Sequence, residues 1–177
     1  MKVNLCRATN LRYDLTFITF AIQPNPAYFS AMKILIIHGP NLPFLGKISA
    51  GTGSRLTLDK VNTSLRRMAQ ESGIELKIFQ FYSEEKILKA VARNRSDIAG
   101  LLISPGALAV NCHALRELLS ILKIKTVEVH LSEMPDAKAS FGQSALRDIA
   151  AERFLEPGLT AYQKGLQYFI KTKDASQ

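Results

Sequence analysis

The sequence predicts an α/β fold in which a five-stranded parallel sheet lies between two layers of helices, a three-layer sandwich. Short apolar runs alternate with helical periodicity from Met32 onward, and this alternation favours parallel strands joined by crossover helices. The chain has 177 residues, the size of one domain, and its 47% apolar and 21% charged residues are typical of a globular protein. No apolar run reaches the length of about 18 residues that a membrane-spanning helix needs.

Five short apolar segments are the expected strands. The first covers residues 33–38 and ends at a Gly-Pro-Asn turn, and the third covers 98–104 and ends at a Pro-Gly pair. The other expected strands are residues 74–81, residues 126–131 and a short segment near 153–155.

Four helices are expected between and after these strands. Apolar residues recur at helical spacing over 58–69 and 114–122. Ser83 can cap a helix that has two glutamates in its first turn. The last helix can start at Pro157 and carries an apolar stripe as far as Ile170.

Residues 1–31 differ in character from the rest, and we expect an N-terminal extension outside the folded domain, which spans 32–177. The extension has a basic start and one apolar stretch over residues 15–22. It resembles a signal peptide only in part, because Asp14 precedes the apolar stretch and Phe29 stands where a cleavage site needs a small residue. A disordered segment, a mis-assigned start and a targeting segment all remain open interpretations.

The composition narrows the choice of partners. A net charge of +8 suits either a nucleic acid or a small anionic substrate, but the basic residues are scattered and no nucleic-acid-binding motif is present, so we do not expect a nucleic-acid partner. Cys6 and Cys112 provide neither a disulfide scaffold nor a CxxC zinc motif. With three histidines and no HExxH pattern, no metal site is expected either. We expect a cytoplasmic protein.

Candidate site residues cluster at the predicted strand ends, where ligands bind in parallel sheets. Glu128 and His130 are two residues apart on one expected strand, so their side chains point to the same face. A carboxylate beside an imidazole fixes its tautomer and favours its protonated form, which suits a general acid; the same pattern also suits a structural ion pair. Ser132 is expected on that face and could bind a hydroxyl or a carboxylate.

Two further strand ends carry weaker signals. Asn41 leaves the first strand in a glycine-containing loop that matches neither a phosphate-binding nor a dinucleotide motif, so it could orient a ligand oxygen or simply form the turn. Ser104 to Ala107 opens an expected helix, whose free N–H groups could favour an anion, although an ordinary turn has the same sequence. Cys112 is most simply a small buried residue.

These strand ends carry a family resemblance. Residues 32–47 (MKILIIHGPNLPFLGK), 101–118 (LLISPGALAVNCHALREL) and 126–133 (TVEVHLSE) resemble the type II 3-dehydroquinate dehydratases in order and spacing, and the resemblance covers residues 32–173. It implies a flavodoxin-like fold, and it implies dehydration of 3-dehydroquinate to 3-dehydroshikimate without a cofactor, in the shikimate pathway or in quinate breakdown. It also implies trimers that pack into a dodecamer.

The resemblance also implies roles for particular residues. In this family a tyrosinate, activated by an arginine of the first loop, removes the proton next to the ketone. Asn41 stands where the family holds a water that stabilises the enolate, and His130, oriented by Glu128, stands where the leaving hydroxyl is protonated. Glu117 stands where an aspartate reaches a neighbouring subunit's site. The resemblance assigns substrate binding to Ser104, where the family has an asparagine, and to Glu117, Leu131 and Ser132.

The base side of that mechanism is missing from the sequence. Aligned without gaps, the activating arginine is Ile48 and the catalytic tyrosine is Gly53, while Val110 and Gly142 replace a substrate-binding histidine and a carboxylate-binding arginine. Losing a positioned base costs about 10²- to 10⁴-fold in rate. Tyr82, at the end of the second strand, is a conceivable replacement. We expect weak or lost activity; the alternative is a non-catalytic oligomeric descendant that binds a small anionic ligand or a partner protein.

Overall fold

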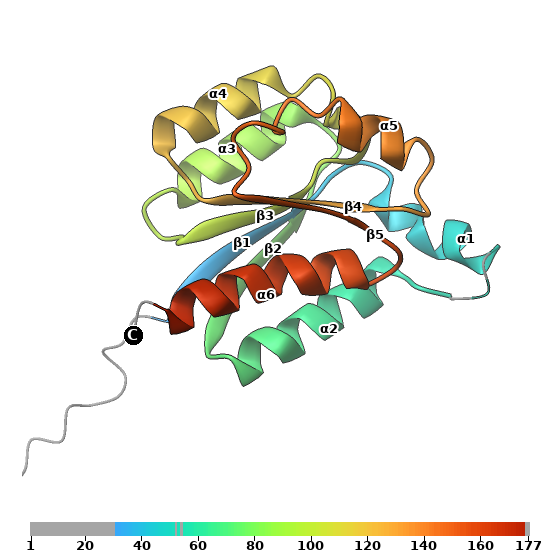
Figure 1. The fold of residues 1–177 in the computed structure, drawn as a ribbon, viewed down its shortest axis with the longest axis horizontal. Coiled ribbons are helices and arrows are strands. Elements are labelled where there is room, and N and C mark those ends of the chain that lie inside the picture. Colours follow the sequence, from blue (N-terminus) through green and yellow to red (C-terminus); the bar gives the residue numbers. More distant parts are fainter. Residues whose placement is uncertain (1–30, 52, 54, 176–177) are drawn as a thin grey trace, which may run out of the picture. The chain divides into compact units, whose positions relative to one another are not determined.

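The computed structural model describes residues 31–51, 53 and 55–175. A single sheet of five parallel strands has the order β2-β1-β3-β4-β5 (Figure 1), which confirms the predicted flavodoxin-like α/β sandwich. The strands are β1 (Met32–His38), β2 (Ile74–Gln80), β3 (Gly100–Ser104), β4 (Thr126–Leu131) and β5 (Glu152–Glu156). Apart from Ala31, the expected N-terminal extension lies outside the described residues.

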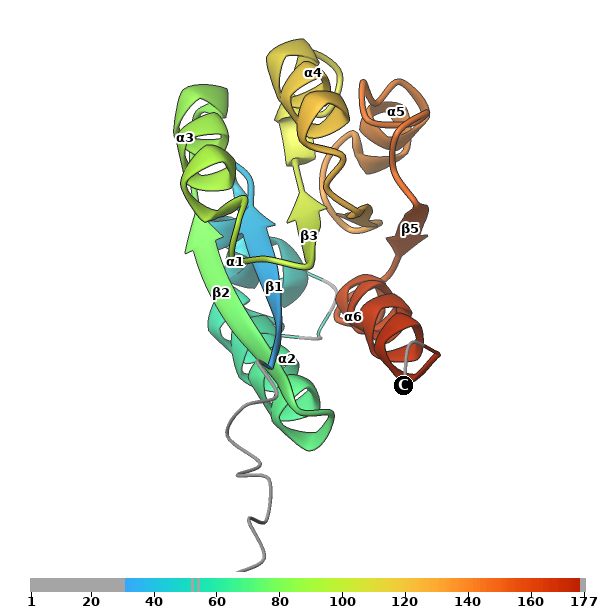
Figure 2. The same ribbon diagram turned by 90° about the vertical axis from the view of Figure 1, so that its left-hand side faces the viewer.

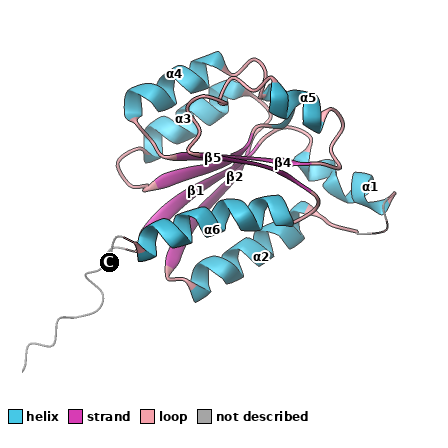
Figure 3. Cartoon of the chain, viewed as in Figure 1, coloured by secondary structure: helices cyan, strands magenta, loops and turns pink. Residues whose placement is uncertain are grey.

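Helices cover both faces of this sheet (Figures 1 and 2). One layer consists of α2 (Leu58–Glu71) and α6 (Thr160–Asp174). The other consists of α3 (Glu84–Asn94), α4 (His113–Leu122) and α5 (Ala137–Gly142). A short helix, α1 (Leu45–Ala50), and two 3₁₀ turns, η2 (Leu42–Phe44) and η3 (Gly106–Leu108), lie in the connections (Figure 3). No helix in the described part of the chain is long and apolar enough to cross a membrane.

The burial of strand β1 shows why the sheet lies between two layers of helices. Ile34 and Ile36 pack in the cluster formed with α2 and α6, while Leu35 and Ile37 pack in the cluster formed with α3 and α4. Successive side chains of a strand point to opposite faces, so a continuous apolar run requires cover on both sides. All four side chains are fully buried, and the carboxyl end of β1 is thereby held inside the sheet, between β2 and β3.

The expected helices are largely confirmed, with differences in the connections. The last helix begins at Thr160 rather than at Pro157. Helices α1 and α5 were not expected, because each has only six residues, too few for helical periodicity to be visible, and such short helices depend on tertiary contacts. In α1, the buried hydroxyl of Ser49 donates to the carbonyl oxygen of Leu56 at 2.7 Å.

The segment after β3 corrects one prediction. Ser104 to Ala107 does not open a long helix; it leads into the three-residue turn η3, and α4 begins only at His113. A helix N-terminus beside Ser104, expected to favour an anion, is therefore not present there.

Candidate functional site

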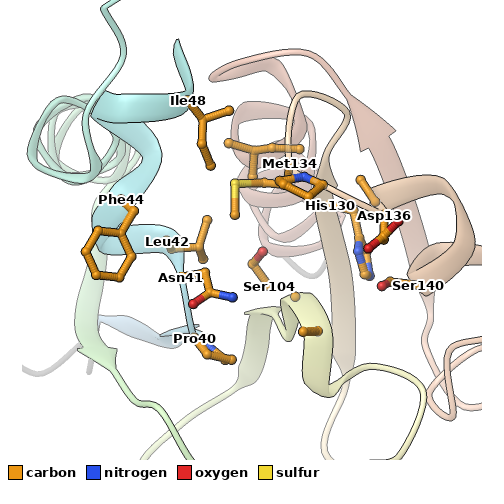
Figure 4. A pocket seen from close by; sticks show the side chains of 15 residues that line it. Pro40, Asn41, Leu42, Phe44, Ile48, Ser104, His130, Met134, Asp136 and Ser140 are labelled. Atoms are coloured by element: carbon orange, nitrogen blue, oxygen red, sulfur yellow. The ribbon is translucent and has the colours of Figure 1, made fainter. Parts of the chain in front are cut away.

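A pocket of about 500 Å³ opens at the carboxyl ends of β1, β3 and β4 (Figure 4). Its size falls in the range typical of small-molecule sites. Figure 4 shows Leu42, Phe44 and Ile48, which follow β1, on one side, and His130 and Asp136, from β4 and the loop after it, on the other. The predicted residues Asn41, Ser104 and Leu131 also line the pocket.

A glycine allows the first and third strand ends to meet. The backbone N–H of Gly39 donates to the carbonyl oxygen of Ser104 at 2.8 Å. A Cβ atom on residue 39 would lie 2.5 Å from the carbonyl oxygen of Pro105, so any larger residue would push the two loops apart. This close approach brings Asn41 and Ser104 to the same pocket.

Glu128 and His130 form the expected same-face pair. Nε2 of His130 lies 2.8 Å from Oε1 of Glu128, and the two side chains are 2% and 0% exposed. Because a carboxylate oxygen accepts, Nε2 carries the hydrogen. The other ring nitrogen, Nδ1, is then the one available to a ligand in the pocket.

Arg153 is a site residue that the sequence reasoning missed. Its Nε donates to Oε2 of Glu128 at 2.7 Å, and its guanidinium carbon lies 4.0 Å from the centroid of the Phe141 ring. It also donates to the carbonyl oxygen of Phe141, whose ring packs edge-on against His130 with centroids 5.6 Å apart. The only sequence signal is an arginine in the short fifth strand; its contact requires the β4–β5 register, which pairs Glu128 with Arg153.

This environment keeps Glu128 ionised. Burial alone would raise the pKa of the carboxyl, but hydrogen bonds from His130, Ser144 and Arg153 outweigh burial and lower its pKa. Glu128 therefore orients His130 and also neutralises Arg153, so the catalytic and the structural interpretations of the pair coexist.

A second buried network lies beneath the pocket. Nε2 of His38 lies 2.8 Å from Oδ1 of Asn62, and Nδ1 lies 2.6 Å from the hydroxyl of Tyr162. Tyr162 also forms a hydrogen bond with Ser104, and burial raises the pKa of the phenol. Burial lowers the pKa of His38 to about 4, against the opposing effect of the Asn62 bond. His38 is thus the centre of a buried hydrogen-bonded network that includes Asn62 and Tyr162.

The remaining candidates lie outside the pocket lining. Strand β4 ends at Leu131, and the exposed Ser132 uses its backbone N–H to donate to the carbonyl oxygen of Glu156 at 3.0 Å. Glu117 lies on α4, in a shallow hollow elsewhere on the surface. Tyr82 is 58% exposed. Cys112 is buried as expected, and burial raises the pKa of its thiol to about 12.

The four positions that the resemblance aligns with missing base and substrate-binding residues of the family differ in where they lie. Ile48 lines the pocket, whereas Gly53, Val110 and Gly142 do not. Gly53 has a φ of 77°, and a Cβ atom there would meet nothing within 4 Å. Among the described residues, the pocket lining contains no tyrosine, arginine or lysine. No group of three or more His, Cys, Asp or Glu side chains in the described part of the chain could hold a metal ion.

The fold and the strand-end Glu–His pair define a class of small parallel α/β proteins with a site at the carboxyl ends of the strands. The family model described as dehydroquinase class II matches residues 32–170, and the chain belongs to this family. It is 32% identical over 136 residues to the 3-dehydroquinate dehydratase of Pelotomaculum thermopropionicum, covering 77% of this chain and 94% of that protein. It is 35% identical over 136 residues to the 3-dehydroquinate dehydratase of Histophilus somni, covering 77% and 91% of the two chains. The crystal structure of a type II dehydroquinase from Butyrivibrio crossotus superposes with a TM-score of 0.70 at 26% identity, covering 78% of this chain and 97% of that one.

Proposed function

We propose that this chain is a type II 3-dehydroquinate dehydratase in which turnover of 3-dehydroquinate is weak or lost. One observation carries the proposal: the side of the pocket where the base and its activator are expected is apolar. Ile48, which the sequence alignment places at the position of the activating arginine, lines this side of the pocket together with Phe44 and Leu42 (Figure 4). No side chain of the described lining could act as the tyrosinate or hold one in its ionised form.

The acid half of the site is retained, but it cannot act by itself. His130 and Glu128 are paired in the geometry that suits protonation of a leaving hydroxyl. In the family mechanism that hydroxyl departs from an enolate, so the acid has no role until a base has removed the neighbouring proton. Loss of the base costs about 10²- to 10⁴-fold, and loss of the arginine removes further stabilisation of the enolate.

Neither nearby tyrosine replaces the missing base. Tyr82 is exposed and lies outside the pocket lining. Tyr162 is fully buried, and its hydroxyl is bonded to His38 and Ser104. Burial raises the pKa of Tyr162, which opposes formation of a tyrosinate.

An absorbance assay for the conjugated enone product tests this proposal. Purified protein should turn over 3-dehydroquinate at least about a thousandfold more slowly than a family member with arginine and tyrosine in its first loop. His130→Gln serves as the comparison for residual activity and should lower any measured rate further. Normal turnover by the unmodified chain would contradict the proposal, and Tyr82→Phe would then test the exposed tyrosine as the base.

The alternative is a non-catalytic oligomer, and one surface favours assembly. Leu88, Leu118 and Ile121 form an apolar hollow between α3 and α4, and Ile121 is 68% exposed. Glu117, at the family's cross-subunit position, borders the same hollow. We therefore propose a closed homo-oligomer, trimers within a dodecamer, whether or not the chain is active. Light scattering should show the oligomer at micromolar concentration, Ile121→Lys should weaken it, and a monomer throughout would contradict the assembly.

A further inference from the structure

We propose that Asp136 is the base of the residual reaction, and that its carboxylate removes the proton next to the ketone from the side of the pocket that carries His130. The inference rests on the proposed function, because a new base is needed only where the first loop supplies no tyrosinate. Three features carry it: the position of the carboxylate, its lack of a partner in the described part of the chain, and the backbone conformation that places it there.

Asp136 supplies the only carboxylate among the described residues that line the pocket. It lies on the same side as His130, in the segment that joins β4 to α5 (Figure 4). Backbone hydrogen bonds hold this segment. The N–H of Met134 donates to the carbonyl oxygen of Leu131 at 3.0 Å, and the N–H of Ala137 donates to that of Met134 at 3.2 Å. The carboxylate therefore has a defined place at the pocket.

The side chain of Asp136 is available to take up a proton. Asp136 is the N-cap residue of α5, but its side chain makes no capping hydrogen bond, and it forms no hydrogen bond or ion pair with any other described residue. The neighbouring carboxylate, Glu128, is bonded to both His130 and Arg153. Because hydrogen bonds to a carboxylate favour its ionised form, Glu128 is the poorer proton acceptor, and Asp136 is the candidate base.

The backbone of Asp136 is in the left-handed region, with a φ of 56° and a ψ of 16°. An N-cap residue normally has an extended backbone, and its side chain accepts from the first turn of the helix. Asp136 forgoes this cap and adopts a conformation that costs free energy, and such costs are typical of functional positions. Asn41, with a φ of 70°, also lines the pocket, and it stands where the resemblance places the water that stabilises the enolate.

The proposed step balances in atoms and electrons. The substrate has a methylene group between its ketone and the carbon that bears the leaving hydroxyl. Asp136 takes a proton from this methylene group, and the C–H electron pair moves into the enolate. The enolate then forms the carbon–carbon double bond and expels the hydroxyl, which leaves as water with a proton delivered by His130. Asp136 releases its proton to solvent and His130 takes one up, so that only water is lost overall.

A carboxylate base also agrees with a low rate. Carboxylates remove protons next to a ketone in other enzymes, so the chemical role is within reach of Asp136. A carboxylate is, however, an intrinsically weaker base than a tyrosinate, and proton transfer to it is correspondingly slower. Weak turnover is therefore the expected result of moving the base from the first loop to Asp136.

Deuterium exchange of the methylene group tests the inference even where dehydration is too slow to follow. NMR of 3-dehydroquinate in D₂O with the full chain resolves the two methylene hydrogens, one cis and one trans to the leaving hydroxyl. Because Asp136 and His130 lie on the same side of the pocket (Figure 4), the cis hydrogen should exchange faster. No exchange beyond the rate without protein, or faster loss of the trans hydrogen, would overturn the inference.

Variants connect the exchange to Asp136. Asp136→Asn should lower the protein-dependent exchange rate at saturating substrate at least about tenfold, and the fold should be kept because asparagine tolerates the left-handed backbone. Asp136→Glu keeps a carboxylate and should retain part of the rate. Asp174→Asn, on an exposed residue at the end of α6, should leave the rate unchanged. Weaker substrate binding by Asp136→Asn with a full saturated rate would make Asp136 a binding group and overturn the inference.

The absorbance assay separates this inference from the proposed function. Normal dehydration by the unmodified chain would refute the proposed function, whereas slow dehydration with an exchange rate that does not depend on Asp136 would refute this inference alone. His130→Gln should lower dehydration more than exchange, because the acid acts only after the proton has been removed.

Discussion

The two sides of the pocket are built in different ways. The loop side, formed by Leu42, Phe44 and Ile48, stands on the short elements η2 and α1, and Phe44 is 48% exposed. On the strand side, His130 lines the pocket and is bonded to Glu128, which pairs with Arg153 outside the lining; these residues stand on two adjacent strands whose register fixes their contacts. On the strand side, removing one member leaves a buried charge unpaired. On the loop side, Phe44 and Ile48 are only partly buried and can be exchanged with less effect on the fold than the buried Leu42, so this half of the site can change while the strand side is kept.

The largest expected effect of a single substitution comes from breaking the strand side. Glu128→Gln keeps the size of the side chain but leaves the Arg153 guanidinium, 16% exposed, without its anion. Breaking a buried pair in this way should lower the free energy of unfolding by about 3 kcal/mol or more. Chemical denaturation at pH 7 measures this loss.

Two further variants show whether the unpaired charge is the cause. Glu128→Leu combined with Arg153→Met removes both charges and should regain most of the lost stability. Glu85→Gln makes the same chemical change in an exposed pair, where Lys89 lies 2.5 Å away and both side chains are more than half exposed, so no measurable loss is expected. An equal loss in Glu85→Gln would contradict the distinction between the two environments.

His38, the last residue of β1 before the loop side, is bonded to Asn62 and Tyr162, and this buried network should respond to pH. The pKa of His38 is lowered from 6.5 to about 4 by burial, so between these values the unfolded chain binds a proton that the folded chain does not. The contribution of His38 to the free energy of unfolding is therefore fully present above pH 6.5 and is lost as the pH falls toward 4. The total loss is about 3 kcal/mol, of which about 2 kcal/mol is expected between pH 7 and pH 5.

Denaturation curves at pH 7 and pH 5 measure the effect of His38 in a pH range above that in which Glu128 is protonated. The lowered pKa of Glu128 acts in the same direction, but below the ordinary carboxyl pKa of 4.5. His38→Gln removes the titrating group and should flatten the dependence between pH 7 and pH 5. If the free energy of unfolding of this variant still fell by the same amount between pH 7 and pH 5, the pH dependence would come from groups other than His38.

The same comparison explains what the sequence could predict. Strands and long helices were predictable because their apolar periodicity depends only on local spacing, as in β1, where one continuous run is buried on both faces. The Glu128–His130 contact was predictable for the same reason, since residues two apart on a strand share a face. Helices α1 and α5 were not predictable, because six residues show no clear period.

The missed site residues depend on long-range register. Arg153 meets Glu128 only because β5 pairs with β4 in one particular register, and Tyr162 meets His38 across 124 residues of sequence. In the sequence Tyr162 is one member of an apolar helical stripe, and its hydroxyl gives no local sign of a buried partner. Ser132 was expected on the same face as Glu128 and His130, but it follows the end of β4 at Leu131 and does not line the pocket.

The smallest expected effect comes from restoring the loop side alone. Ile48→Arg with Gly53→Tyr reinstates the two family residues, yet the gain in turnover of 3-dehydroquinate should be less than about tenfold. At residue 53 the backbone has a φ of 77°, and a tyrosine there costs about 1–2 kcal/mol in the left-handed region. A Cβ atom at that position meets nothing within 4 Å, so the side chain has room, but residue 53 does not line the pocket.

Adding Gly142→Arg should increase turnover by more than its separate effect, because groups that act on one substrate are not additive. Residue 142 has open space for a side chain at the end of α5, so the arginine could supply the missing partner for a carboxylate. Ile48→Met with Gly53→Ala is the matched control, which changes the same positions without adding a charge or a phenol. If the loop pair alone recovered a thousandfold, the loop side would have to rearrange around the new residues, and the strand side would already have been complete without its carboxylate partner.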